Sequence, residues 1–181
     1  SLGDVLMCTP AIRAIKQSRP GRFVSLLSSR SGVAAAPFIP ELDAVLEYPA
    51  PWMKSSARRL PAADIAFIDT LAARRFDAVV IFTSYSQSAL PAALMCYLAG
   101  IPLRLAHCRE NPYQMLSDWL PYPEPDTMIK HEVRRQLDLV ASIGCTPSSA
   151  GLSFAVRDND IESVRARLAG RGINVARQWI L

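Results

Sequence analysis

The sequence predicts an α/β fold, a Rossmann-like parallel sheet with helices on both faces. Short apolar segments alternate along the chain with segments of helical periodicity, which is typical of parallel sheets covered by helices. The segment "FDAVVIFT" (76–83) is almost continuously apolar, as expected of a strand buried on both faces. The chain has 181 residues, of which 50% are hydrophobic and 20% charged, so it is long and apolar enough to bury a real core.

The first segment is predicted to be an amphipathic helix from Asp4 to the stop at Pro20-Gly21. Pro10 lies inside this pattern and lacks an amide hydrogen, so we expect the first turns to be irregular or kinked. Strands are predicted at 22–29, 43–49, 76–83, 101–108 and 178–181, and helices at 64–74, 131–143 and 158–169. A short helix and turn is predicted at 31–42, and a polar turn followed by an apolar helix at 84–100. Proline-containing loops are expected at 49–61 and 109–126.

Composition excludes several classes of function. The 20 basic and 16 acidic residues give a net charge of +4, which is not the dense basic stripe of a nucleic-acid-binding protein. No apolar run is long enough to span a bilayer. The cysteines are far apart and are interpreted as reduced thiols of a cytosolic protein: Cys8, Cys96, Cys108 and Cys145. Two histidines and no Cys/His cluster argue against a structural zinc site.

The opening "SLGD" is the first candidate for a site. Ligands of doubly wound sheets bind beyond the carboxyl ends of strands, where loops lead into helices. Gly3 permits close approach to the backbone there. Asp4 has two interpretations, and spacing alone favours a helix cap over a residue that faces a ligand. The G-x-G-x-x-G fingerprint of dinucleotide binding is absent.

The stretch "SLGDVLMCTPAIRAIKQSRPG" resembles the opening of bacterial family 9 glycosyltransferases, the ADP-heptose:lipopolysaccharide heptosyltransferases and their relatives. The matching positions are Ser1, Gly3, Asp4, Pro10 and Ala11. Segments 74–82, 99–110 and 130–144 resemble later family motifs in the same order and at similar distances. The resemblance therefore covers nearly the whole chain.

The resemblance implies the GT-B architecture, in which two Rossmann-like domains face each other across a cleft. Residues 1–181 would form one acceptor-binding N-terminal domain, with its first strand before residue 1 and the donor-binding domain after residue 181. The donor would be a nucleotide sugar, ADP-heptose, bound mainly by that other domain, and no cofactor or metal is implied. The acceptor would be an anionic glycan or glycolipid of the lipopolysaccharide-core type. The resemblance implies a cytoplasmic enzyme with peripheral contact at the inner membrane, inactive as this fragment alone.

The resemblance also implies roles for individual residues. Asp4 would take the proton of the acceptor hydroxyl, since inverting transfer needs a base. Basic groups border the expected cleft in three loops and suit an anionic acceptor, although each can also be ordinary solvated charge: Lys54, Arg58 and Arg59; Arg104, His107 and Arg109; Lys130 and His131. The expected acceptor-binding residues are Ser1, Gly3, Arg58, Arg104, His107, Arg109 and His131.

The loop aromatics have two interpretations, stacking on sugar rings or lipid and, as the favoured one, packing as lids on the domain itself: Trp52, Tyr113, Trp119 and Tyr122. Two other functions stay open at this level. One is a non-catalytic glycan-binding module with the same fold. The other is a nucleotide-dependent enzyme such as a sugar epimerase or dehydrogenase, which would need a glycine-rich phosphate loop that "SLGD" does not supply.

Overall fold

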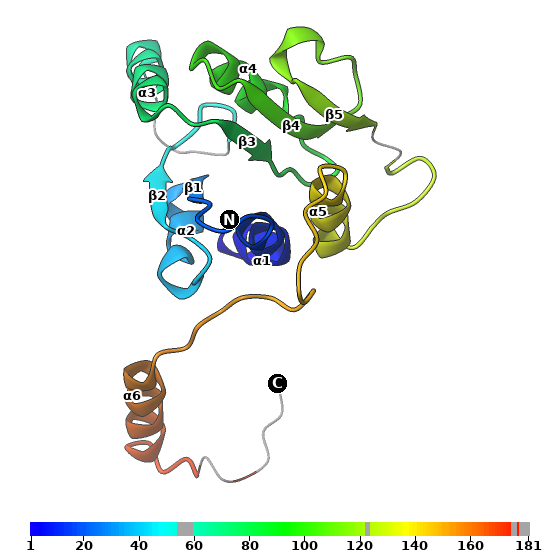
Figure 1. The fold of residues 1–181 in the computed structure, drawn as a ribbon. Coiled ribbons are helices and arrows are strands. Elements are labelled where there is room, and N and C mark those ends of the chain that lie inside the picture. Colours follow the sequence, from blue (N-terminus) through cyan, green and yellow to red (C-terminus); the bar gives the residue numbers. More distant parts are fainter. Residues whose placement is uncertain (54–59, 122–123, 175–176, 178–181) are drawn as a thin grey trace.

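Helices and parallel strands alternate along the chain in the computed structural model (Figure 1). The structure describes residues 1–53, 60–121, 124–174 and 177. The helices are α1 (Leu2–Gln17), α2 (Arg30–Val33), α3 (Pro61–Arg74), α4 (Leu90–Leu98), α5 (Glu132–Ala141) and α6 (Asp158–Ala169), with two short 3₁₀ turns, η1 (Ala36–Phe38) and η2 (Tyr113–Met115). The strands are β1 (Ser25–Ser28), β2 (Ala44–Glu47), β3 (Ala78–Ile81), β4 (Leu103–Cys108) and β5 (Asp118–Pro121).

Every strand pair that the described residues form is parallel, which confirms the predicted fold class. The strands lie in two hydrogen-bonded sheets, β1-β2 and β3-β4-β5. β5 was expected to be part of a loop, and it pairs with β4 in the register Leu105–Asp118. The strand expected at 178–181 lies outside the described residues.

Helices cover both faces of the strands. Val79 packs with Met95 and Cys96 of α4, whereas its neighbour Val80 packs with Ala11 of α1 and Val140 of α5. This alternation follows from the period of two in a strand, which sends successive side chains to opposite faces. Figure 1 shows α3 and α4 on one side of the strands and α1 and α5 on the other.

Helices α1 and α5 run side by side in the same direction. Ala11 and Ala14 in the second half of α1 pack against Val140 and Cys145 at the end of α5. The amide of Ser148, which follows α5, donates to Oε1 of Gln17, the last residue of α1, at 3.1 Å. Both helices therefore begin at the same end of the domain.

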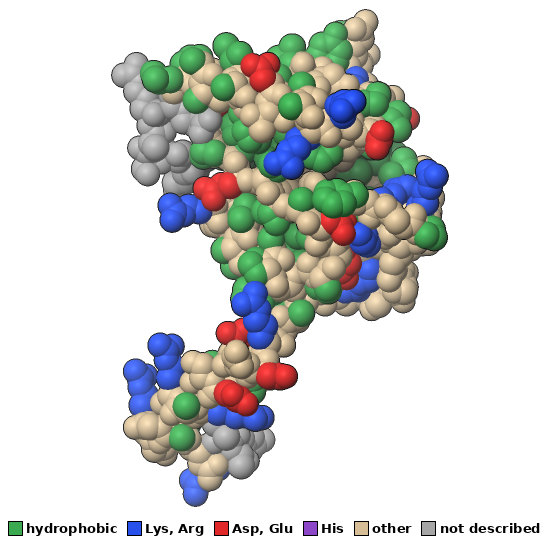
Figure 2. All heavy atoms as spheres, turned by 60° about the vertical axis from the view of Figure 1, so that its left-hand side comes forward, with side chains coloured by type: hydrophobic (Ala, Val, Ile, Leu, Met, Phe, Trp, Pro, Cys, Tyr) green, Lys and Arg blue, Asp and Glu red, His purple; other side chains and the backbone are tan. Residues whose placement is uncertain are grey.

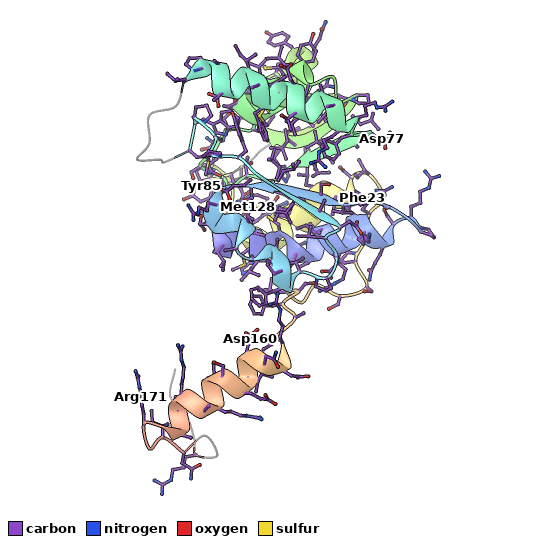
Figure 3. All side chains as sticks on the ribbon, turned by 90° about the vertical axis from the view of Figure 1, so that its left-hand side faces the viewer. Phe23, Asp77, Tyr85, Met128, Asp160 and Arg171 are labelled. Atoms are coloured by element: carbon purple, nitrogen blue, oxygen red, sulfur yellow. The ribbon has the colours of Figure 1, made fainter. Side chains whose placement is uncertain are left out.

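That end is the carboxyl edge of the sheet, because His107 near the end of β4 contacts the backbone of α5: its Nε2 lies 3.2 Å from the Arg135 carbonyl oxygen. Figure 3 shows the two edges apart. Phe23 and Asp77, which precede β1 and β3, lie at one edge, and Tyr85, which follows β3, lies at the other.

Helix α1 is continuous through Pro10, so the first turns are regular and not interrupted, whereas a kink at Pro10 stays a prediction. Proline at position 10 cannot donate to the Leu6 carbonyl, four residues earlier. The Thr9 hydroxyl takes that place and donates to the Leu6 oxygen at 2.7 Å. The helix also begins two residues earlier than expected, with Ser1 as its N-cap and Asp4 inside the first turn.

Helix α6 stands away from the rest of the domain at the end of an extended segment (Figure 1). None of its residues is buried, although Ile161, Val164 and Leu168 recur at helical spacing. Among the described residues, no helix is long and apolar enough to cross a membrane.

Candidate functional site

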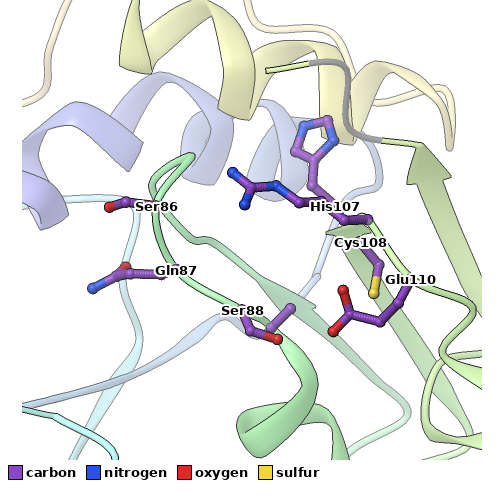
Figure 4. Close-up of a pocket in the computed structure, with 8 residues that line it drawn as sticks. Ser86, Gln87, Ser88, His107, Cys108 and Glu110 are labelled. Carbon is purple, nitrogen blue, oxygen red and sulfur yellow. The ribbon is translucent and has the colours of Figure 1, made fainter. Parts of the chain in front are cut away.

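A small open pocket of about 140 Å³ lies at the carboxyl edge of the strands. One wall is the turn between β3 and α4, and the other is the end of β4 with the residues that follow it (Figure 4). The lining is mostly polar and consists of Ser86, Gln87, Ser88, Ala89, His107, Cys108, Arg109 and Glu110. Its position is where a doubly wound fold binds ligands.

The two walls are joined at Arg109, whose guanidinium donates to the Tyr85 carbonyl. Arg109 and Glu110 are exposed, so the pocket offers a cation and an anion together with hydroxyl and amide groups. Such a mixture can donate hydrogen bonds to a ligand and accept them from it. Hydroxyl-rich molecules with some negative charge fit this chemistry.

His107 and Cys108 belong to the pocket floor. Burial lowers the pKa of His107, and the nearby charges of Arg135 and Lys130 lower it further, against the opposing bond to the Arg135 carbonyl. The ring is therefore neutral at pH 7, and the role of His107 in acceptor binding stays a prediction. Burial, with the Glu110 carboxylate, raises the pKa of the Cys108 thiol. A protonated thiol is a poor nucleophile.

Asp4 lies at the same edge, in the first turn of α1. The backbone nitrogen of Ser1 donates to Asp4 Oδ2 at 2.6 Å, and Ser1 Oγ donates to the same oxygen at 2.8 Å, as in a capping box. The carboxylate is ionised at neutral pH and its side chain is 76% exposed, so it is accessible as a proton acceptor.

The carboxylates of Asp4 and Glu132, in the first turns of α1 and α5, both raise the pKa of the same buried thiol, that of Cys8. Burial raises the pKa of Cys8 to about 12, and the carboxylates of Glu132 and Asp4 contribute to that rise. Two carboxylates and the polar pocket are thus gathered at one edge of the domain.

The other predicted residues are distributed as follows. Ser1 is the N-cap of α1, and Gly3 is exposed in its first turn, where an added Cβ would meet only Ser1 Oγ at 3.9 Å. His131 is the exposed N-cap of α5, at the carboxyl edge. The ammonium of Lys130 is paired with Asp138 at 2.8 Å. Lys54, Arg58 and Arg59 lie outside the described residues.

Arg104 does not line this pocket, and its role in acceptor binding stays a prediction. It lies near the beginning of β4, whereas the pocket lies beyond its end. Its guanidinium is occupied by backbone carbonyls, among them those of Met115 and Gln114, both at 2.8 Å. Its charged carbon also lies 5.4 Å from the centre of the Tyr97 ring. Arg104 therefore holds the η2 turn onto the start of β4.

The loop aromatics divide in the same way. Trp52 packs on Tyr48 with ring centres 5.9 Å apart, which agrees with a lid on the domain itself. Tyr113 is 79% exposed, Trp119 is partly exposed, and Tyr122 lies outside the described residues. All four cysteines are free and buried, as predicted for reduced thiols. Among the described residues no cluster of His, Cys, Asp and Glu could hold a metal ion.

The sequence prediction missed Ser86, Gln87, Ser88 and Glu110. The signal was present, since the polar run "TSYSQS" directly follows the clearest strand of the chain and leads into a helix. The distribution of basic side chains does not indicate the position of the pocket. On the face shown in Figure 2, Lys and Arg side chains are scattered over the surface and do not gather into one patch.

The fold is similar to that of about half of two solved glycosyltransferases. Two solved structures match over 97% of the chain. A glycosyl transferase family 9 protein from Veillonella parvula matches with a TM-score of 0.70 and 13% identity, over 48% of its own length. The ADP-heptose lps heptosyltransferase II of E. coli matches with a TM-score of 0.65 and 15% identity, over 49% of its length.

The chain thus spans about half the length of both structures, and at these identities the likeness shows the fold. The sequence resemblance to family 9 glycosyltransferases therefore agrees with the solved structures at the level of the fold. The sequence itself matches no protein-family model and no curated protein.

Proposed function

We propose that this chain is the acceptor-binding half of an inverting glycosyltransferase. One observation carries the proposal. In a fold shared with family 9 glycosyltransferases, an exposed carboxylate and a polar pocket both lie at the carboxyl edge of the strands. Substrates of open α/β sheets bind at that edge.

Asp4 is the catalytic base in this proposal. The acceptor hydroxyl oxygen forms a bond to the anomeric carbon of the donor sugar, while the bond from that carbon to the nucleotide diphosphate breaks. The proton of the hydroxyl passes to Asp4, and the diphosphate leaves with the bonding electrons. A carboxylate that is ionised and exposed at neutral pH can take up this proton as the attack proceeds.

The acceptor lies in the pocket, with its anionic groups toward Arg109 and His131 and its hydroxyls toward the Ser86–Ser88 turn and Glu110. Ser1 and Gly3 border it at the start of α1, and Arg58 remains assigned to the acceptor by family resemblance. The proposed acceptor is an anionic glycan or glycolipid of the lipopolysaccharide-core type, and the proposed donor is ADP-heptose. Both agree with the name of the matched E. coli structure. Such an acceptor places the enzyme at the cytoplasmic face of the inner membrane.

The test is Asp4→Asn in a protein that carries both the acceptor and the donor half. Transfer should fall by about 10²–10⁴-fold, the usual contribution of a positioned base. Binding of the nucleotide sugar, measured by calorimetry, should stay unchanged. Asp69→Asn is the matched control, because Asp69 is an exposed carboxylate on α3, away from the pocket. Undiminished transfer by Asp4→Asn would remove Asp4 from the mechanism.

The same experiment separates the two alternative functions. A non-catalytic glycan-binding module would bind the acceptor glycan without any transfer by wild type. A nucleotide-dependent epimerase or dehydrogenase would bind a dinucleotide, and the opening "SLGD" lacks the glycine-rich loop for it.

A further inference from the structure

The turn that forms one wall of the pocket is closed by its own hydrogen bonds. The Gln87 amide donates to the Ser84 carbonyl at 3.1 Å, and Ser84 Oγ lies 3.2 Å from Ser86 Oγ. These bonds fix the shape of the turn. They do not fix where the turn lies, so its position depends on contacts with other elements.

Helix α5 supplies two of those contacts. Gln136 Nε2 donates to the Thr83 carbonyl oxygen, at the base of the turn, at 3.0 Å. The guanidinium carbon of Arg135 lies 5.6 Å from the centre of the Tyr85 ring, a cation–π distance. Tyr85 lies at the carboxyl edge of the domain (Figure 3).

The side chain of Gln136 is itself held in one orientation. It is 1% exposed, and the same Nε2 donates to Glu132 Oε1 at 2.5 Å. The Thr83 carbonyl oxygen and the Glu132 carboxylate oxygen act as hydrogen-bond acceptors here. The group that faces both must therefore be the amide NH₂, which offers two hydrogens.

Glu132 is anchored in turn by a buried ion network. Arg135 Nη1 donates to Glu132 Oε2 at 2.5 Å, and Arg135 Nε donates to Glu124 Oε2 at 2.7 Å. Arg135 is 1% exposed and Glu124 is 3% exposed. Removing one partner from such a buried network costs several kcal/mol of stability, so the network holds its side chains in fixed positions. Gln136 is the direct hydrogen-bonded link from this network to the turn.

We propose that Gln136 is a positioning residue, which holds the Thr83–Ser88 turn at a fixed place relative to the α1–α5 helix pair. Since α1 carries Asp4 and the turn carries Ser86, Gln87 and Ser88, Gln136 sets the distance between the proposed base and the bound acceptor. That catalytic consequence rests on the proposed function. The mechanical role does not, because it follows from the contacts alone.

The test compares Gln136→Leu with Val140→Ala. Leucine is similar in size but offers no donor to Thr83. Val140 is a buried residue of the same helix that packs on α1, and its apolar side chain cannot hydrogen-bond to the turn, so its truncation destabilises α5 without removing the link. Both variants are studied at a temperature where melting curves show them fully folded.

Amide hydrogen exchange of residues 84–88 should become about tenfold faster in Gln136→Leu, corresponding to the loss of one buried hydrogen bond, and should stay unchanged in Val140→Ala. In the protein with both halves, the KM for the acceptor glycan should rise about tenfold in Gln136→Leu, since the turn binds only the acceptor. The KM for the donor should not change.

Equal effects of the two variants, or no faster exchange in Gln136→Leu, would overturn the proposal. If Gln136→Leu does not fold, Tyr85→Leu and Tyr85→Phe decide: the leucine variant should exchange faster at 84–88, and the phenylalanine variant, which keeps a ring over Arg135, should not. Identical exchange in these two would count against the proposal. Absence of acceptor binding by wild type would contradict the proposed function alone, because the exchange measurement needs no ligand.

Discussion

Glu124 links the stability of the buried network around Arg135 to pH. Its carboxylate receives two nitrogens of buried Arg135 and the backbone amide of Lys130. Burial tends to raise the pKa of Glu124, but the hydrogen bonds and the positive charge outweigh it, so the pKa lies below the usual 4.5. The ionised form is therefore bound more favourably in the folded than in the unfolded chain.

We predict that Glu124→Gln lowers the free energy of unfolding by about 3 kcal/mol at pH 7, since it removes the charge that faces a buried guanidinium. The stabilisation by Glu124 is present above pH 4.5 and is lost as the pH falls through its lower folded pKa. The difference between variant and wild type should therefore shrink below pH 4.5. Urea unfolding at pH 7 and at acidic pH measures it, and a difference independent of pH would contradict the assignment.

Three basic residues of one short segment show why residue types alone did not define the site. Arg104, His107 and Arg109 lie within six residues, and each was expected to bind the acceptor. Arg104 is at the start of β4 and is used by backbone carbonyls, His107 is buried and neutral, and Arg109 alone is an exposed cation of the pocket. Which end of a strand a residue occupies depends on strand boundaries, and these are the least certain part of a sequence-based prediction.

At the scale of elements, α1 joins the core to the segment that follows α5. Thr9 Oγ1 donates to the Leu6 carbonyl and also accepts from the Ser153 amide at 2.9 Å. Beside it, Arg13 bonds the carbonyls of Ser149 and Gly151 at 3.0 and 2.8 Å. The hydroxyl that replaces the missing proline donor is therefore also an anchor for residues 149–153.

We predict that Thr9→Val lowers the free energy of unfolding by about 2 kcal/mol, because it leaves a buried carbonyl and a buried amide without their partner. Exchange of the Ser153 amide should become faster at the same time. Thr70→Val is the matched control, since Thr70 Oγ1 also bonds a helix carbonyl, that of Ala66 at 3.0 Å, but at an exposed position. Comparable decreases in the free energy of unfolding of both variants would show that the buried Thr9 hydroxyl contributes no more to stability than the exposed Thr70 hydroxyl.

Periodicity predicted most elements, and it failed where a side-chain contact decided the outcome. It identified β3, β4 and the core helices, because long apolar patterns have few other solutions. It predicted irregular or kinked first turns in α1, because a proline inside a helix lacks an amide donor and the replacement bond from the Thr9 hydroxyl is not visible in the sequence. It missed β5, whose four residues Asp-Trp-Leu-Pro lack an apolar run and are ordered by pairing with β4. The pocket turn was predicted only as a polar turn, since its role arises from the residues opposite it.

At the scale of the whole molecule, residues 148–157 belong to the domain body and α6 does not. Phe154 stacks on Phe38 with ring centres 4.7 Å apart, and the Ala155 amide donates to the Phe38 carbonyl at 2.7 Å. Beyond this point, Arg157 lies over the Phe38 ring at 5.1 Å and α6 begins. A separate helix of 12 residues is marginal in water, so we expect α6 to add little to the stability of the body.

We therefore predict that ending the chain after Arg157 leaves the melting temperature of the body unchanged within about 1 °C, because no buried residue is removed from α6. Ending it after Pro147 should lower that temperature by about 5 °C or more, since the bonds of Ser153 and the Phe154 stack are lost. Calorimetric melting of the two shortened chains beside the 181-residue chain measures both effects. A clear loss of stability on removal of α6 alone would show that this helix contributes to the body, and the boundary would then lie after it.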